Sequence, residues 1–411
     1  MRSRPRTGSE PRLSSPKPMT LAPMILAPLI LAILMAAVGC DPGPEDPIRI
    51  GATMSETGAY ATQGIPALNG YRLCVADVNE EGGLFGRPVE LVSYDDESSS
   101  ETAIVLYERL ITEDRVDAVL GPYGSTLTEA VAPVTERHRQ VMISPLAATT
   151  SIWEQGRRYL FMVLPPAELF LAGLIEMASD HGLERVAVLQ EDALFPRAAG
   201  GGAAELAREK GMEVVLHETY PSGTEDFSPL LTRIQAEGAQ VLAMSASALG
   251  DFVTVIRQMR DADVDVAMFG TSGAVAEFQE ALGEMAEYAY GLSAWEPGLP
   301  NPGIDPFVEA YQETFGQDPS FHAAGAYGSC QLFMEAARRG GSLEAEALRS
   351  ALLDLETQTV FGPFAVDERG YQTANQGVFI QWQDGEKVVV WPEEVATADA
   401  RFPTPRWRDR E

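Results

Sequence analysis

Three polar loops carry the residue types that could hold a small ligand. They read MSETGAYATQG from Met54, GPYGST from Gly121 and SPLAATTS from Ser144, and each follows an apolar segment. Glycine lets backbone N–H groups approach a ligand closely. Ser125 and Thr149 stand where helices are expected to begin, so their hydroxyls and the neighbouring amides could accept a small carboxylate. The alternative is that Ser125 merely caps its helix.

Motifs of enzyme chemistry are missing from the sequence. It contains no His-Glu-x-x-His, no Cys-x-x-Cys, no Gly-x-Ser-x-Gly, no Walker loop and no Gly-x-Gly-x-x-Gly after a strand. The histidines are scattered, which gives a metal site weak support: His138, His181, His217 and His322. Ser125 has no evident histidine partner, which disfavours an exported hydrolase. We therefore predict a protein with no catalytic residue, no metal and no cofactor.

The segments around the loops alternate between apolar strands and amphipathic helices. Strands are expected at IRIGAT, PVELVSYDDES, VDAVLGP and QVMISP. Helices are expected from Pro66 to a stop at Gly82–Gly83, over 102–112 and over 125–138. Strands that are apolar throughout are covered on both faces, so the pattern predicts a parallel, doubly wound α/β layer.

The same pattern then restarts. Helices are expected over 168–181, 203–210, 229–237 and 251–262, between strands such as RVAVLQED and VAMFGTSG. Two more helices follow Trp295, and GVFIQWQDGEKVVVWP is expected to form a hairpin with Asp-Gly at its turn. Two similar layers with a tail that can cross back imply two lobes joined by several strands.

The start of the chain is typical of an export signal. Five basic residues precede the apolar run Leu21–Val38, and Cys40 follows it, ahead of the tether-like DPGPEDP. We expect residues 1–39 to be a signal peptide, and 40–47 to be a lipidated cysteine with its tether, as in bacterial lipoproteins. An uncleaved anchor is the alternative, because spanning needs about 20 apolar residues. Both place the remaining chain in the periplasm or at the cell surface, attached to a membrane.

Net charge and cysteine content narrow the partners and the chemistry. The formal charge of −30 repels nucleic acid and anionic lipid headgroups, so no nucleic-acid partner is expected. Only three lysines occur, which removes most lysine-based phosphate sites. Cys74 and Cys330 lie in helical, partly apolar contexts, where we expect two buried free thiols. A single disulfide is the alternative in an exported protein.

Longer motifs resemble the leucine/isoleucine/valine-binding protein family, the type I periplasmic binding proteins that serve ABC importers. The resemblance runs from IRIGATMSETGAYATQGIPALNGYRLCVADVNEEGG through VDAVLGPYGSTLTEAVAPV, VMISPLAATT, EDFSPLLTRIQAEGAQVL and MFGTSG to FGPFAVDERG. It implies two Rossmann-like doubly wound lobes joined by three crossover strands, a small-molecule ligand between them, an ABC permease as partner and a monomer. Lobe 1 would comprise 48–163 plus 296–355, lobe 2 would comprise 164–295 plus 356–395, and 396–411 would be a tail.

The resemblance also suggests ligand-binding residues. Ser125, next to Tyr123 and Gly124, matches the serine that holds the ligand carboxylate in the family. Tyr60 matches an aromatic residue that packs on the ligand, and Phe195 stands where a tyrosine usually closes over it. One loop matches the family segment that supplies further donors to the carboxylate and a carbonyl for the amino group: Leu146, Ala147, Ala148 and Thr149. The family threonine aligns with Ala148, and Thr149 is the next residue.

Two positions depart from the amino-acid binders of this family. Ala248 replaces a frequent aromatic residue, and Ser272 stands where those proteins place an acid against the ligand ammonium. A desolvated ammonium without a carboxylate is costly, so we expect a carboxylate ligand lacking the α-ammonium. The alternative is that Glu191 or Asp192 supplies the charge. A sensory module that signals to a membrane partner is the alternative function, because both roles use the same fold.

Overall fold

The structure is a computed structural model, and it describes residues 46–273 and 277–410. The apolar run Leu21–Val38 and the proposed lipidation site Cys40 lie outside the described residues. Within these two ranges, no helix is both long enough and apolar enough to cross a membrane.

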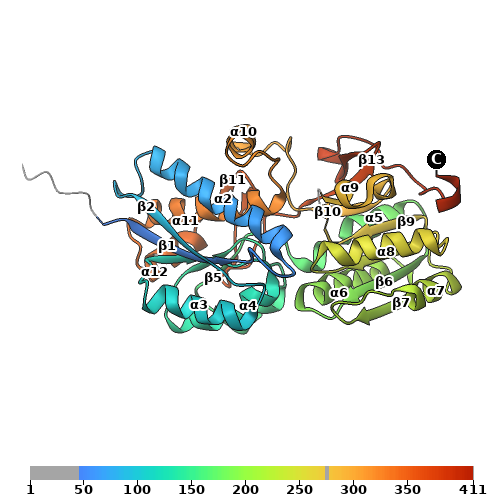
Figure 1. The fold of residues 1–411 in the computed structure, drawn as a ribbon, viewed down its shortest axis with the longest axis horizontal. Helices are drawn as coiled ribbons and strands as arrows, with labels where there is room; N and C mark the ends of the chain where they lie inside the picture. Colours follow the sequence, from blue (N-terminus) through green and yellow to red (C-terminus); the bar gives the residue numbers. More distant parts are fainter. Residues whose placement is uncertain (1–45, 274–276, 411) are drawn as a thin grey trace, which may run out of the picture. The chain divides into compact units, whose positions relative to one another are not determined.

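The first sheet contains five parallel strands in the order β2-β1-β3-β4-β5. The strands are β1 (Ile48–Met54), β2 (Val89–Asp95), β3 (Ala118–Leu120), β4 (Met142–Ser144) and β5 (Leu160–Met162). On one face α2 packs against α11, and on the other α3 packs against α4 (Figure 1). Their bounds are α2 (Ala61–Glu80), α3 (Ser100–Thr112), α4 (Gly124–Arg137) and α11 (Phe321–Gly340).

The second sheet contains seven strands in the order β14-β13-β10-β9-β8-β6-β7. The parallel strands are β6 (Arg185–Glu191), β7 (Glu213–Tyr220), β8 (Val241–Ser245), β9 (Met268–Thr271) and β10 (Tyr290–Ser293). The antiparallel strands are β13 (Val378–Gln383) and β14 (Glu386–Trp391). The helices of this layer are α5 (Ala172–Asp180), α6 (Leu194–Glu209), α7 (Ser228–Ala236), α8 (Leu249–Asp261) and α9 (Glu277–Leu282).

Both faces of the second sheet are buried, as the apolar strand sequences predict. Along β6, Val186 and Val188 belong to one hydrophobic cluster, whereas Ala187 and Leu189 belong to another. Successive side chains of a strand point to opposite faces, so helices must cover both sides. The prediction of doubly wound α/β layers is confirmed.

The chain passes between the two sheets three times: after β5, after β10, and between β12 and β13. The segment before the last passage holds α10 (Ile304–Phe315), α11, α12 (Ala345–Leu353), β11 (Thr357–Thr359) and β12 (Gly362–Phe364). Short 3-10 helices complete the described chain: η1 (Thr150–Gln155), η2 (Ala167–Leu169), η3 (Gly283–Ala286), η4 (Glu393–Val395) and η5 (Trp407–Asp409). The three expected crossovers are confirmed.

Several helices begin within two residues of their expected starts, but α2, α5 and α6 do not. Helix α2 begins at Ala61 and contains Pro66, which was expected to open it. The turn ahead of the proline is already formed, because the N–H groups of Gln63 and Gly64 donate to the carbonyl of Tyr60 at 3.1 and 2.8 Å. Pro66 lies inside the helix and lacks the N–H that would donate to the carbonyl of Thr62.

Helix α6 begins at Leu194, nine residues before its expected start at Ala203. The glycines that suggested a helix start lie inside it. A Cβ atom on Gly202 would lie 2.2 Å from the carbonyl oxygen of Glu168. Glycine is thus needed there because η2 approaches α6 closely, and the expected helix over 168–181 is divided into η2 and α5.

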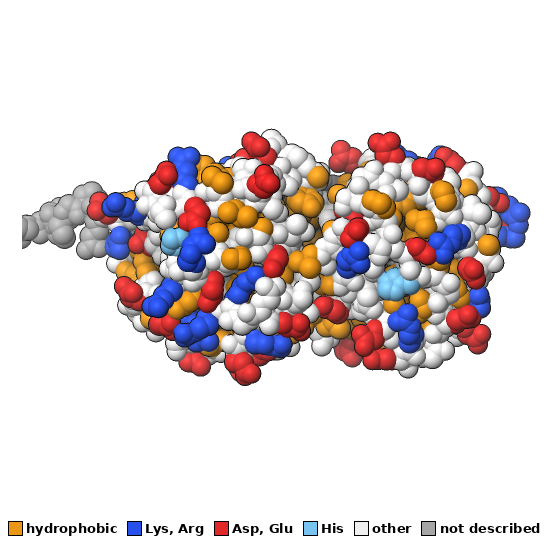
Figure 2. All heavy atoms as spheres, turned by 90° about the horizontal axis from the view of Figure 1, so that it is seen from below, with side chains coloured by type: hydrophobic (Ala, Val, Ile, Leu, Met, Phe, Trp, Pro, Cys, Tyr) orange, Lys and Arg blue, Asp and Glu red, His pale blue; other side chains and the backbone are white. Residues whose placement is uncertain are grey.

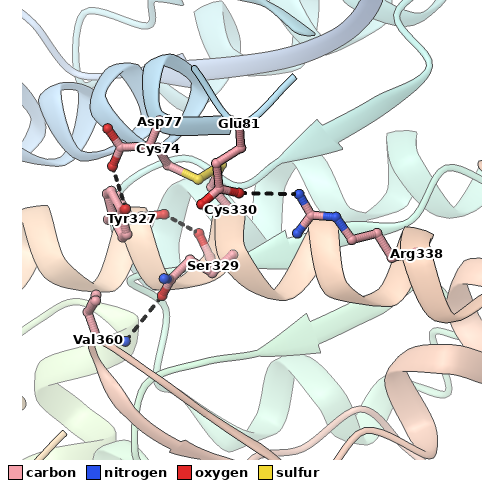
Figure 3. Close-up of a disulfide and its surroundings, with 10 residues drawn as sticks. Cys74, Asp77, Glu81, Tyr327, Ser329, Cys330, Arg338 and Val360 are labelled. Carbon is pink, nitrogen blue, oxygen red and sulfur yellow. Dashed lines mark hydrogen bonds and ion pairs between the residues drawn. A yellow bond between two sulfur atoms is a disulfide. The ribbon is translucent and has the colours of Figure 1, made fainter. Parts of the chain in front are cut away.

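The expectation of two free thiols is wrong. Cys74 of α2 and Cys330 of α11 form a disulfide between the two packed helices (Figure 3). The helices are close enough for this bond, since a Cβ atom on Gly70 would lie 2.2 Å from the carbonyl oxygen of Ala323. The Cα atoms of the cysteines are 6.3 Å apart, within the range that a disulfide spans. The partners are 256 residues apart in sequence, so their helical contexts did not reveal the pairing.

The hairpin of β13 and β14 is confirmed, with positive φ at both Asp384 and Gly385. After β14 the chain packs along the second sheet: the backbone N–H of Thr404 donates to the carbonyl of Ala267 at 3.0 Å. On the face shown in Figure 2, acidic and basic side chains are interspersed, with no broad basic patch.

Candidate ligand-binding pocket

The strand order of both sheets marks one place for a ligand. In the first sheet the order reverses between β1 and β3, and in the second it reverses between β6 and β8. In open α/β sheets, ligands bind outside the carboxyl ends of the strands at such a reversal, because the adjacent loops diverge there. The loops after β1 and β3 are two of the three polar loops of the sequence, and the third follows β4.

A pocket of about 70 Å³ lies where these loops meet the loops after β6, β8 and β9. From the first sheet it is lined by Tyr60, Gln63, Tyr123, Gly124, Thr126 and Leu146. From the second sheet it is lined by Phe195, Ala246, Ser247, Ala248, Leu249, Ser272 and Gly273. Leu164, Phe170, Phe252, Phe321 and His322 complete the wall. A cavity that holds one water molecule has a volume of about 10–15 Å³ when it is measured in the same way. The pocket therefore has room for a small molecule.

Six of the residues predicted from the sequence line this pocket: Tyr60, Tyr123, Gly124, Leu146, Phe195 and Ser272. The other four do not line it: Ser125, Ala147, Ala148 and Thr149. They are buried in the adjoining loops, with exposures of 0 to 2%. The structure thus brings the predicted residues to one region and separates those that face the pocket from those that support it.

Ser125 does not cap its helix. The N-cap of α4 is Tyr123, without a side-chain capping bond. Instead the Ser125 hydroxyl oxygen accepts hydrogen bonds from the backbone N–H groups of Ala148 and Thr149, each at 3.2 Å. It therefore joins the loop after β3 to the loop after β4, and holds Gly124 and Leu146 in the same wall.

Tyr60 is positioned by a buried network below the first loop. The carboxylate of Asp96 accepts hydrogen bonds from the hydroxyls of Thr53, at 2.8 Å, and Ser55, at 2.5 Å. Ser98 Oγ accepts a bond from the backbone N–H of Tyr60 at 3.0 Å. These contacts fix the chain between β1 and α2, so the Tyr60 ring has a defined place in the wall.

Three polar side chains in and behind the wall have unused hydrogen-bonding capacity. Gln63 Oε1, Thr149 Oγ1 and Ser272 Oγ are buried and have no hydrogen-bond partner among the described residues. A buried polar atom left unpaired costs about 1–3 kcal/mol. Gln63 and Ser272 line the pocket, so the polar groups of a bound ligand, or water molecules, would offset this cost there.

Among the described residues that line the pocket there is no aspartate, glutamate, lysine or arginine. Burial lowers the pKa of His322 to about 3, so its imidazole is neutral at neutral pH. Burial, and then the charge of Glu191, raises the pKa of Tyr60, which keeps its hydroxyl protonated. The wall therefore carries no formal charge at neutral pH.

Glu191 lies directly behind the wall residue Ser247. It ends β6, is buried, and its carboxylate accepts hydrogen bonds from Ser222 Oγ at 2.5 Å and from the backbone N–H of Ser247 at 2.8 Å. Asp192, in contrast, is exposed and pairs with Arg197 at 2.8 Å. Of the two acids considered from the sequence, Glu191 alone contacts a residue of the pocket wall.

Sequence reasoning missed a large part of the wall. His322 and Phe321 begin α11, far along the chain from the three polar loops, and the histidines appeared only as scattered residues. Phe170 and Phe252 stand on elements of the second lobe that carried no motif. The position of α8 directly after β8, at the strand-order reversal, could have indicated Leu249 and Phe252. We find no sequence signal for His322.

Known proteins share this arrangement. A family model described as periplasmic binding protein matches residues 47–387. The Leu/Ile/Val-binding protein homolog 7 of Brucella suis biovar 1 (strain 1330) is 26% identical over 377 residues, covering 87% of this chain and 94% of that protein. Homolog 8 of Brucella abortus (strain 2308) is 28% identical over 384 residues, covering 86% and 93%.

Solved structures have the same fold. The substrate-binding protein LivJ of a branched-chain amino acid transporter from Streptococcus pneumoniae, in complex with isoleucine, superimposes with a TM-score of 0.75 at 23% identity, covering 84% of this chain and 100% of that one. An ABC transporter solute-binding protein from R. palustris, in complex with benzoate, gives a TM-score of 0.75 at 18% identity, covering 84% and 96%. The resemblance seen in the sequence is confirmed: this chain belongs to the periplasmic binding protein family, whose members are solute-binding proteins and not enzymes.

Proposed function

We propose that this protein captures a small carboxylate-bearing molecule, an amino acid or a related compound, and delivers it to an ABC permease. The observation that carries the proposal is the pocket at the strand-order reversals of both sheets, with unpartnered polar atoms in and beside its wall. A solute-binding protein holds its ligand in a pocket between two lobes, and in periplasmic binding proteins the lobes close around the ligand by a hinge motion.

A carboxylate suits the first-lobe wall. Gly124 and Thr126 lie in the first turn of α4, a helix of 14 residues, and both line the pocket. The N-terminal N–H groups of a helix have no partner within it, and its dipole favours negative charge there. These local donors would capture an anion despite the formal charge of −30 on the whole chain.

Two proteins of the same fold support a small ligand with a carboxylate. The Streptococcus pneumoniae protein was solved with isoleucine and the R. palustris protein with benzoate, and both ligands carry one carboxylate. For this chain we favour a carboxylate without an α-ammonium, since no acidic side chain is found among the lining residues that the structure describes. Glu191 remains the alternative partner for an ammonium, because it lies behind Ser247.

Membership of the family puts the protein outside the cytoplasm. The disulfide between Cys74 and Cys330 fits an oxidising compartment. We propose that a lipid group on Cys40 attaches the protein to the membrane, so that it stays near its permease; this rests on the sequence around that cysteine.

A thermal-shift screen with amino acids, their keto acids, aromatic acids and dicarboxylates tests the proposed ligand class, followed by calorimetry on each compound that raises Tm. We expect stabilisation by one or more monocarboxylates, because a bound ligand stabilises the folded state by RT ln(1 + [L]/Kd). A protein that responds only to sugars or cations would contradict the proposal.

A further inference from the structure

Aromatic rings from both lobes line the pocket. Tyr60, Tyr123 and His322 form one series, with ring centroids 5.4 Å apart for Tyr60 and Tyr123 and 5.7 Å apart for Tyr123 and His322. From the other lobe, Phe170 and Phe195 meet edge to face at 5.0 Å. Aromatic pairs prefer such tilted or edge-to-face arrangements at 4.5–7 Å. A planar ring in the pocket would meet rings from both lobes.

His322 brings hydrogen-bonding nitrogens into this apolar wall. It is the second residue of α11 and is only 5% exposed, and its ring lies 3.8 Å from that of Phe321. A neutral imidazole has one N–H donor and one acceptor nitrogen. Since it lines the pocket, a ligand polar group can reach it.

The groups that surround His322 are uncharged. Tyr60 and Gln63 reach the pocket from the start of α2, and Tyr123 reaches it from the loop before α4. Along the same pair of helices, Asp77 accepts a hydrogen bond from Tyr327 at 2.5 Å, five residues further along α11. From the second lobe, Glu191 is already bonded to Ser222 and Ser247, and Asp251 is already bonded to the hydroxyl of Tyr220. An anionic ligand would therefore meet a donor, and no carboxylate among the described lining residues.

We propose that the pocket takes a small aromatic monocarboxylic acid, whose ring packs among these aromatic side chains and whose carboxylate accepts a hydrogen bond from the imidazole N–H of His322. This rests on the proposed function and names its ligand class. None of the described lining residues is acidic, which disfavours an α-ammonium, and the aromatic wall favours a ring over a branched chain.

The first experiment uses the whole mature protein and measures Kd by calorimetry for benzoate, cyclohexanecarboxylate, L-leucine and glycine betaine. Cyclohexanecarboxylate keeps the acid and the size of benzoate but has no π-system. We expect benzoate to bind most tightly, about two- to tenfold more tightly than cyclohexanecarboxylate, which is the usual additional effect of aromatic pairs. Leucine and betaine should bind more weakly than both acids.

The second experiment tests His322. His322→Phe keeps a ring in the wall and removes the N–H, so we expect the affinity for benzoate to fall about ten- to hundredfold, the value of a hydrogen bond to a charged group. The affinity for benzamide should fall less, because its hydrogen bond is neutral. His181→Phe is the matched control: His181 stacks on Phe402 at 4.0 Å and does not line the pocket. Equal losses for benzoate and benzamide would show a purely structural role.

If His322→Phe does not fold, ¹⁵N-histidine spectra of the wild type provide the same test. Benzoate should shift one imidazole resonance strongly, and an unchanged set of histidine resonances in the complex overturns the role of His322. Tighter binding of leucine than of benzoate overturns the aromatic ligand class but leaves the proposed function intact. Tighter binding of betaine than of benzoate would show that the aromatic rings bind a cation, and this overturns the aromatic ligand class. Binding of no carboxylate at all overturns both the inference and the proposed function.

Discussion

The hydroxyl of Tyr123 donates a hydrogen bond to the carbonyl oxygen of Ser247 at 3.3 Å. Tyr123 follows β3 in the first sheet and Ser247 follows β8 in the second, and both line the pocket. The backbone N–H of the same Ser247 is held by Glu191. Ser247 is thus hydrogen-bonded through its N–H to Glu191 of its own sheet and through its carbonyl to Tyr123 of the first lobe.

Tyr123→Phe should weaken ligand binding about two- to tenfold, because a net contribution of about 0.5–1.5 kcal/mol from the interlobe hydrogen bond is lost. The ring remains, so the aromatic wall should persist. Calorimetry with the tightest ligand from the screen measures the effect. Tyr94→Phe is the control, since Tyr94 bonds Asp114 at 3.0 Å away from the pocket. An unchanged Kd for Tyr123→Phe would mean that this bond does not stabilise the bound state.

Ser125→Ala should lower both ligand affinity and stability. Its hydroxyl oxygen is the acceptor for the N–H groups of Ala148 and Thr149, and unsatisfied buried groups cost about 1–3 kcal/mol each. With two N–H groups left unsatisfied, we expect the free energy of unfolding to fall by about 2–6 kcal/mol and ligand affinity to fall about tenfold. Urea denaturation and calorimetry separate the two effects, with the exposed Thr112→Ala as control. Weaker binding at full stability would indicate direct contact with the ligand.

Removing the disulfide should destabilise the first lobe. The double variant Cys74→Ala/Cys330→Ala removes the covalent link between α2 and α11, and a disulfide typically contributes about 2–4 kcal/mol. Its Tm should be lower than that of the wild type and should not respond to a reducing agent. Reductant should lower the Tm of the wild type towards the same value. If a reducing agent that is present during thermal unfolding leaves the Tm of the wild type unchanged, the cysteines are not paired in solution.

Cys40→Ser tests the anchor. Lipidation needs the thiol, so we expect the variant to leave the membrane fraction, whereas the wild type stays there because a diacylated anchor holds stably. Fractionation of the producing cells and immunoblotting measure the distribution. Retention of the variant in the membrane would instead identify the apolar run Leu21–Val38 as an uncleaved span.

Glu191→Gln tests whether Glu191 pairs with the α-ammonium of a ligand. We expect L-leucine to bind weakly to the wild type and its keto acid to bind better, since Ser272 offers only a hydroxyl. The glutamine variant should then bind the keto acid within about threefold of the wild type, because its amide can still bond Ser222 and Ser247. Micromolar leucine binding that disappears in Glu191→Gln, with no response to the keto acid, would show that Glu191 supplies the missing charge.

The alternation of apolar strands and amphipathic helices was enough to predict two doubly wound layers, because strand and helix periods are local properties of the chain. The three glycine- and hydroxyl-rich loops marked the first-lobe wall, since residues at the ends of parallel strands meet at one edge of a sheet. Local sequence could not show that Gly202 allows η2 to pack on α6, that Cys74 reaches Cys330, or that Ser125 bonds the loop after β4. Nor could it place His322 beside Tyr123. These contacts join segments that are distant in the chain, and only the packing of helices and sheets decides which of them meet.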